Sequence, residues 1–90
     1  WDARRGQWLR DEVVLPPEDV CTRIRWHTAN IDQVYLEHVG YGSVPGTGEI
    51  GDGEILACLE AADRREQRWI LHVLHRDGQW VESVIRLRSE

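Results

Sequence analysis

Polar and apolar residues alternate along most of this chain with a period of two, which indicates strands that bury one face and expose the other. The segment 20–28 shows the pattern most clearly. Its apolar face carries Thr22, Ile24 and Trp26, and its polar face carries Arg23, Arg25 and His27. The same alternation predicts further strands over residues 8–15, 31–39, 54–59, 68–75 and 79–88.

Turn residues separate these segments. Pro16 and Pro17 end the first strand, because proline donates no backbone hydrogen bond. Six glycines between residues 40 and 53 predict a long connection or a bulged edge. Asp77-Gly78 predicts a tight hairpin between the last two strands, since glycine accepts the positive φ that such turns need.

Two segments allow a second interpretation. Residues 54–62 also fit a helical stripe capped by Asp52, although a strand over 54–59 followed by a turn over 63–67 is the favoured interpretation. In the last strand Val81, Ser83, Ile85 and Leu87 share one face, and Trp80 and Val84 share the other. A bulge there would exchange the two faces.

Six or seven short strands and no convincing long helix predict an all-β fold, a sandwich of about seven antiparallel strands. We expect one domain over residues 7–90, preceded by a linker remnant over residues 1–6. The chain begins at Trp1 and contains no methionine, so we expect it to be a segment of a longer or processed protein.

The net charge of the chain argues against nucleic acids and anionic membranes as partners. Sixteen acidic and eleven basic residues give a net charge of −5, so the chain lacks the basic excess with which proteins bind nucleic acid or anionic membranes. No apolar run approaches the roughly 20 residues of a membrane-spanning helix. The two cysteines fit either two buried thiols or one disulfide, and composition alone does not decide between them.

The order of motifs between Pro16 and Leu87 resembles the immunoglobulin-like repeats of bacterial surface and secreted proteins. The motifs begin with Cys21, the Ile-Arg-Trp strand at 24–26, the Asn-Ile-Asp turn at 30–32, the Val-Tyr-Leu strand at 34–36 and the Val-Pro-Gly-Thr-Gly loop at 44–48. They end with Cys58, the Trp-Ile-Leu-His-Val strand at 69–73 and the Asp77-Gly78 hairpin. The chain departs from the repeats at Ile31, at Leu59 and in a longer connection before Trp69.

This resemblance implies an immunoglobulin-like β-sandwich braced by a Cys21–Cys58 disulfide. The bridge would join the start of the Trp26 strand to the 54–59 strand and clamp the two layers of the sandwich. In the chain-entropy model it would contribute roughly 3–4 kcal/mol. A disulfide also implies an oxidising compartment, so the expected location is extracellular or on the cell surface.

The histidines and acidic residues, which most often act in catalysis or bind metals, give little indication of a catalytic site. His72 and His75 are three apart and fall on opposite faces of a strand, and His27 and His38 are expected to be solvated strand positions. Glu49, Asp52 and Glu54 lie in a glycine-rich segment where calcium could bind, but the EF-hand spacing is missing. The sequence contains neither the serine-centred nucleophile turn of hydrolases, nor a phosphate-binding glycine-rich loop, nor a CxxC motif. We therefore expect no catalytic residue, no cofactor and no metal.

The five tryptophans divide into two groups. Trp26 and Trp69 are in phase with the expected core. A second apolar face on the last hairpin, with Trp8 from the first strand, would form an interaction surface of Ile70, Leu74, Trp80, Val84 and Trp8. Either the 60–67 segment or the N-terminal strand covers this face, or a neighbouring domain or another chain contacts it.

These expectations favour a non-enzymatic accessory module of a larger extracytoplasmic bacterial protein, acting as a spacer or a protein-interaction domain. The alternative is a carbohydrate-binding module, in which Trp80, Trp8 or Tyr41 stacks on sugar rings. A small enzyme that uses His72 or His75 with a nearby carboxylate is the third class.

Overall fold

The computed structural model describes residues 12–15, 20–59 and 66–89, which form seven strands and no helix. The strands are β1 (Glu12–Leu15), β2 (Cys21–His27), β3 (Ile31–His38), β4 (Gly42–Ser43), β5 (Asp52–Cys58), β6 (Glu66–His75) and β7 (Trp80–Ser89). The expected all-β class is confirmed, and the ambiguous segment after Asp52 is a strand as far as Cys58. None of the described residues belongs to a helix that could cross a membrane.

Some sequence expectations fall wholly or partly outside the described residues. These include the linker over residues 1–6, the start of the first strand at residues 8–11 and most of the turn expected over 63–67. The last two residues of that turn, Glu66 and Gln67, are already part of β6. The turn prediction is therefore wrong at this end, because the alternation of exposed and buried side chains in β6 begins before Trp69.

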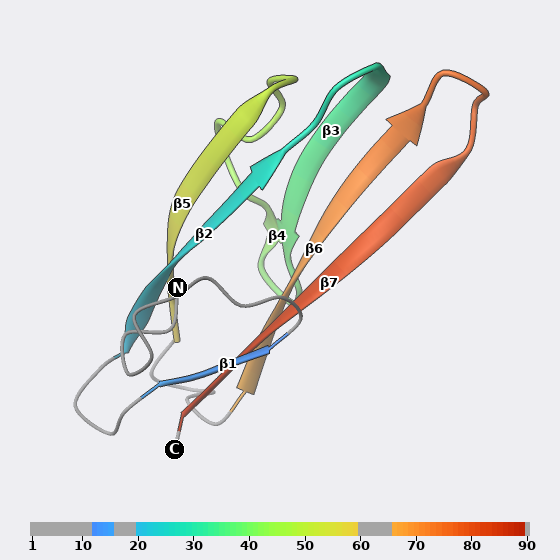
Figure 1. The fold of residues 1–90 in the computed structure, drawn as a ribbon. Helices are drawn as coiled ribbons and strands as arrows, with labels where there is room; N and C mark the ends of the chain where they lie inside the picture. Colours follow the sequence, from blue (N-terminus) through green and yellow to red (C-terminus); the bar gives the residue numbers. More distant parts are fainter. Residues whose placement is uncertain (1–11, 16–19, 60–65, 90) are drawn as a thin grey trace.

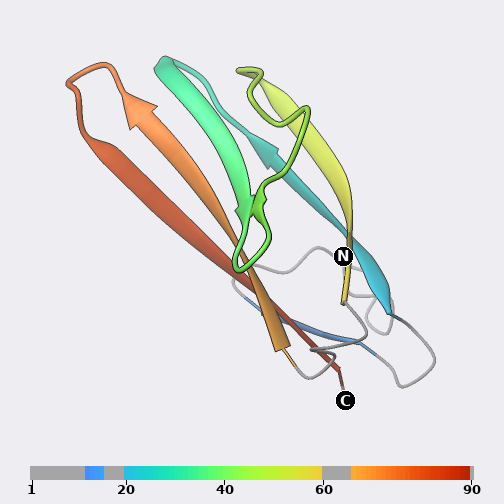
Figure 2. The same ribbon diagram turned by 180° about the vertical axis from the view of Figure 1, so that it is seen from behind.

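The strands are arranged in two sheets of unequal width (Figures 1 and 2). The larger sheet has the order β1-β7-β6-β3-β4, and the smaller sheet pairs β2 with β5. Every pair is antiparallel except β1 and β7, which run parallel from Glu12 opposite Arg86 to Leu15 opposite Ser89. The expectation of antiparallel strands throughout is wrong for this pair. No short connection joins β1 to β7, so no tight turn forces them to run in opposite directions.

One hydrophobic core lies between the sheets. Trp69, Leu36 and Leu87 are almost fully buried on the inner face of the larger sheet, and Ile24 and Ala57 contribute from the smaller one. Trp26 packs against this core as a partly buried side chain. Burying these apolar side chains is the main free-energy gain of the fold. The placement of Trp26 and Trp69 predicted from their phase is confirmed.

The faces of β7 follow the expected phase without a bulge. Its register with β6 runs unbroken from Leu74 opposite Trp80 to Glu66 opposite Arg88. Ile85 and Leu87 therefore point to the core side, whereas Trp80 and Val84 are on the outer face. Val81 shares the inner face but is 47% exposed. Two strands cover only part of a five-stranded sheet, and the hairpin end of β7 remains open to solvent.

The disulfide between Cys21 and Cys58 is present, as the resemblance implied. The two residues are directly opposite each other in the register of β2 and β5. The bridge therefore lies within the smaller sheet and joins neighbouring strands. The expectation that it clamps the two layers together is wrong, because both cysteines belong to the same layer.

Side-chain and backbone hydrogen bonds hold the connections. The Thr47 hydroxyl donates to the Val44 carbonyl at 2.8 Å and accepts the Leu36 N–H at 3.0 Å, which fixes the glycine-rich connection against β3. The predicted Asp77-Gly78 hairpin is confirmed, with Gly78 at φ 88°. The His75 N–H donates to the Gln79 carbonyl at 2.9 Å and closes the hairpin.

Candidate interaction surface

The outer face of the larger sheet carries aromatic side chains near the β6–β7 hairpin. Tyr35 of β3 is directly opposite His72 of β6, and Trp80 of β7 is opposite Leu74. Opposite residues of antiparallel strands share a face, so these side chains form one surface on the side away from Leu36 and Leu71. We call Tyr35, His72 and Trp80 the outer aromatic patch.

The three rings of the outer aromatic patch contact one another. The rings of Tyr35 and His72 are stacked, with centroids 4.5 Å apart and an interplanar angle of 14°. Trp80 meets Tyr35 edge to face, with centroids 5.8 Å apart. Both arrangements are favourable for aromatic pairs. Trp80 nevertheless stays 49% exposed, so this patch offers a large apolar side chain to solvent.

Two carboxylates flank the imidazole of His72. Its Nε2 lies 2.8 Å from a Glu37 oxygen, and its Nδ1 lies 3.5 Å from a Glu82 oxygen. The His72 side chain is 12% exposed, whereas those of Glu37 and Glu82 are 35% and 59% exposed. Because a carboxylate only accepts hydrogen bonds, Nε2 donates to Glu37. The imidazole is thereby fixed in place, with carboxylate oxygens at the edge of the patch.

Within the described part of the chain, the polar contacts of His72 are with the carboxylates of Glu37 and Glu82, and none of them is with the serine, threonine or cysteine that a histidine activates in nucleophilic catalysis. His75, the other candidate of the small-enzyme hypothesis, is an exposed residue at the end of β6.

Four of the five residues predicted for the interaction surface share this face. Trp80 is part of the outer aromatic patch. Ile70 is opposite Val84, and Leu74 is opposite Trp80, so these three aliphatic residues border the patch. Val84 is 37% exposed, and Ile70 and Leu74 are half-buried. Trp8 lies outside the described residues. Whether the surface binds a partner stays a prediction.

Sequence reasoning missed the polar half of this surface. Tyr35 and Glu37 alternate with Val34 and Leu36, which puts the two pairs on opposite faces of the strand, but nothing in the sequence places Tyr35 and Glu37 beside the last hairpin. The pairing of β3 with β6 brings them there. Alternation along one strand defines its faces, whereas the identity of the neighbouring strand depends on the whole sheet.

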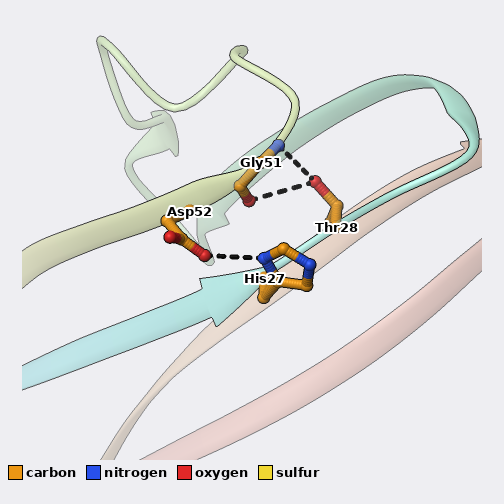
Figure 3. A network of polar contacts seen from close by, with 4 residues as sticks. All are labelled: His27, Thr28, Gly51 and Asp52. Carbon is orange, nitrogen blue, oxygen red and sulfur yellow. Dashed lines mark hydrogen bonds and ion pairs between the residues drawn. The ribbon is translucent and has the colours of Figure 1, made fainter.

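A second polar cluster closes the open end of the smaller sheet (Figure 3). His27 Nδ1 lies 2.6 Å from an Asp52 oxygen, and the Thr28 hydroxyl accepts the Gly51 N–H at 3.1 Å. The side chains of His27 and Asp52 are 70% and 89% exposed. The prediction that His27 is solvated is confirmed. Water competes strongly for such exposed ion pairs, and this one contributes little binding chemistry.

The prediction for His38 is wrong. Its ring is stacked on Trp69 with centroids 4.2 Å apart and on Tyr41 at 4.3 Å, and its Nε2 lies 2.6 Å from the Gln67 side-chain oxygen. His38 shares the parity of Val34 and Leu36, which place it on the inner face of β3. That phase was visible in the sequence. Tyr41 itself is 56% exposed, but it lies beyond the end of β3.

The calcium hypothesis gains no support from the geometry. Glu49, Asp52 and Glu54 do not assemble into a metal-binding group, and among the residues that the structure describes no three acidic, histidine or cysteine side chains are arranged so that they could hold a metal ion. Asp52 contacts His27 instead.

Comparison of the chain with protein-family models, with curated proteins and with solved structures gives no match. The function must therefore be argued from the described residues themselves.

Proposed function

We propose that this chain is an immunoglobulin-like accessory module of a larger extracytoplasmic bacterial protein, and that its outer aromatic patch binds a protein partner. The carrying observation is the exposed apolar surface beside the β6–β7 hairpin. Trp80 is 49% and Val84 is 37% exposed there, with Ile70 and Leu74 bordering them. A centre of tryptophan, tyrosine and aliphatic residues surrounded by a polar rim is typical of protein interfaces.

The extracytoplasmic location is supported by the disulfide, because such bridges persist in oxidising compartments and are rare in the cytosol. The bacterial origin and the immunoglobulin-like family rest on the resemblance of the motif order. Two sheets around one core are consistent with that family. The partner is a neighbouring domain of the parent protein or another protein chain.

Site-specific photo-crosslinking in the parent protein tests this proposal. A photoreactive phenylalanine analogue at position 80 is expected to form a covalent adduct with a protein partner. The same analogue at position 56 is the matched control, because Leu56 is 65% exposed on the smaller sheet, away from the patch. We expect adducts from position 80 alone. Equal crosslinking from both positions, or none from position 80, would contradict the proposal.

A carbohydrate ligand is the second candidate, and one observation favours it. The patch combines Tyr35 and Trp80 with the carboxylates of Glu37 and Glu82, and aromatic faces stack on sugar rings while carboxylates accept hydrogen bonds from hydroxyl groups. A glycan array with the wild-type chain and Trp80→Ala separates the two functions. Glycan binding that Trp80→Ala abolishes would replace the protein partner by a sugar.

A further inference from the structure

Glu82 is the carboxylate beside the outer aromatic patch that receives the weakest hydrogen bonding. It lies on β7, next to β6 and β3 in the larger sheet (Figure 1). Its oxygen is 3.5 Å from Nδ1 of His72, which is long for a hydrogen bond, and this is its one polar contact among the residues that the structure describes. The Glu82 side chain is 59% exposed. This carboxylate can therefore accept hydrogen bonds from a partner.

His72 cannot neutralise both of the carboxylates that flank it. A neutral imidazole has one N–H, and Nε2 donates it to Glu37 at 2.8 Å. Nδ1 is then an acceptor that faces the Glu82 oxygen. A protonated imidazole donates at both nitrogens but brings one positive charge to two negative ones. In either state the group of Glu37, His72 and Glu82 keeps a net negative charge.

The indole of Trp80 lies beside this negative charge. Trp80 and Glu82 are two residues apart on β7, so both side chains project from the outer face, about 7 Å apart. Tyr35 meets the indole edge to face, with ring centroids 5.8 Å apart, and helps to hold it in position. Trp80 is still 49% exposed. Indole rings attract cations, so an exposed indole beside a carboxylate favours a cationic ligand.

Arginine is the side chain that matches the indole and the carboxylate together. Its planar guanidinium stacks on an indole, and its forked N–H groups donate to a carboxylate in pairs. Lysine offers a compact ammonium group without the planar face or the fork. A sugar supplies hydroxyl donors but no positive charge to balance Glu82.

The aliphatic border of the patch defines what surrounds this arginine. Ile70 and Leu74 are diagonal to Glu82 in the register of β6 and β7, and Val84 follows it on the same face of β7. Apolar side chains around an ion pair exclude water and strengthen the attraction between the charges. A partner segment with apolar residues beside its arginine fits this surface, whereas an acidic segment would meet like charge.

We propose that the protein partner of the outer aromatic patch presents an arginine, whose guanidinium stacks on Trp80 and donates to the carboxylate of Glu82. Apolar residues beside this arginine contact the aliphatic border. The inference deepens the proposed function and rests on it, because it names the chemistry of the partner at the same surface.

Photo-crosslinking from position 84 of the parent protein recovers the partner segment. Val84 borders the patch and is 37% exposed, and a photoreactive analogue placed there leaves Trp80 and Glu82 intact. Mass spectrometry of the adduct identifies the partner peptide, in which we expect an arginine flanked by apolar residues. A peptide without an arginine would overturn the inference and leave a protein partner in place.

The affinity of the recovered peptide measures the role of its arginine. Citrulline has the shape of arginine without its charge. Replacing the arginine by citrulline should weaken binding to the wild-type chain at least about tenfold, because charge-assisted hydrogen bonds are lost. On the Glu82→Gln variant the same replacement should weaken binding about threefold or less, since the charged acceptor is already gone. Fluorescence anisotropy of the labelled peptides gives the four dissociation constants.

Glu66→Gln is the matched control. Glu66 is an exposed acidic residue on the outer face of the same sheet, opposite Arg88 and away from the patch. We expect this variant to bind the arginine peptide as the wild type does, and thermal unfolding shows that both variants keep the fold. Equal weakening by Glu82→Gln and Glu66→Gln would mean that the charge of the whole face attracts the peptide, and would overturn the inference.

The outcomes separate the inference from the proposed function. Protein adducts from positions 80 and 84, together with equal affinities of the arginine and citrulline peptides, would overturn the inference alone. The absence of a protein adduct from both positions would overturn the proposed function, and the inference with it. A tenfold preference for arginine that Glu82→Gln removes and Glu66→Gln preserves is the result expected from the structure.

Discussion

At the scale of single residues, the indole of Trp26 occupies the space where a side chain at residue 53 would lie. The two residues are directly opposite in the register of β2 and β5, and the indole lies over the glycine backbone. A Cβ atom at position 53 would lie 2.1 Å from Cε2 of Trp26. The absence of a side chain at residue 53 is therefore what allows Trp26 to reach the core.

Gly53→Ala should destabilise the fold. The indole of Trp26 must move to accept the methyl group, and overpacking of this kind costs about 1–3 kcal/mol. Urea denaturation followed by tryptophan fluorescence measures the loss. Gly48→Ala is the matched control, since its Cβ would meet only the Val34 carbonyl at an ordinary 3.7 Å. Equal losses for both variants would mean that backbone freedom, and not the Trp26 contact, requires glycine at residue 53.

Single residues also show which buried positions could be predicted from the sequence and which could not. The inward phase of Trp26 and Trp69 follows from alternation and could be predicted. The buried Thr47, 3% exposed, could not, because its partners Leu36 and Val44 are brought to it by the path of an irregular connection. Periodicity carries no information where the chain has no period.

At the scale of elements, the alternation predicted strand positions well and strand neighbours poorly. The expected strands over 20–28 and 31–39 match β2 and β3 to within one or two residues. The Asp77-Gly78 hairpin correctly identified β6 and β7 as neighbours, because a tight turn leaves them no other pairing. The pairing of β3 with β6, which builds the outer aromatic patch, joins strands that no short turn connects.

The smaller sheet is the element that depends most on the disulfide. Two isolated strands are marginally stable, and the Cys21–Cys58 bridge ties one end of this pair. Reduction should cost roughly 3–4 kcal/mol in the chain-entropy model. We expect it to raise amide hydrogen exchange in β2 and β5 more than in β3 and β6.

Hydrogen exchange with and without reductant, read by mass spectrometry, checks this expectation. A variant with serine at both cysteines should behave as the reduced chain does. If β6 and β7 lost protection to the same extent as β2 and β5, the disulfide would be supporting both sheets.

At the scale of the whole molecule, the larger sheet pairs the first described strand, β1, with the last, β7. Glu12 is opposite Arg86, and Arg88 also forms a 2.8 Å ion pair with Glu12. Val13 and Leu15 of β1 are 4% and 2% exposed. β1 therefore fills the core beside Leu87, although almost the entire chain separates it from β7.

Because closing a long loop costs entropy before any contact compensates for it, we expect the β1–β7 pairing to form late in folding. Leu15→Ala should lower the free energy of unfolding by about 2–5 kcal/mol, as expected for a buried leucine. The change should appear mainly as faster unfolding, because we expect β1 to join after the folding transition state.

Leu71→Ala is the matched comparison, since Leu71 lies in the β6–β7 hairpin opposite Ser83 and should already be packed in that state. Stopped-flow folding and unfolding rates in urea measure both variants. If Leu15→Ala slowed folding as much as Leu71→Ala, the terminal strands would meet early, and the sheet would be built from its β1 edge inward instead of from the hairpin outward.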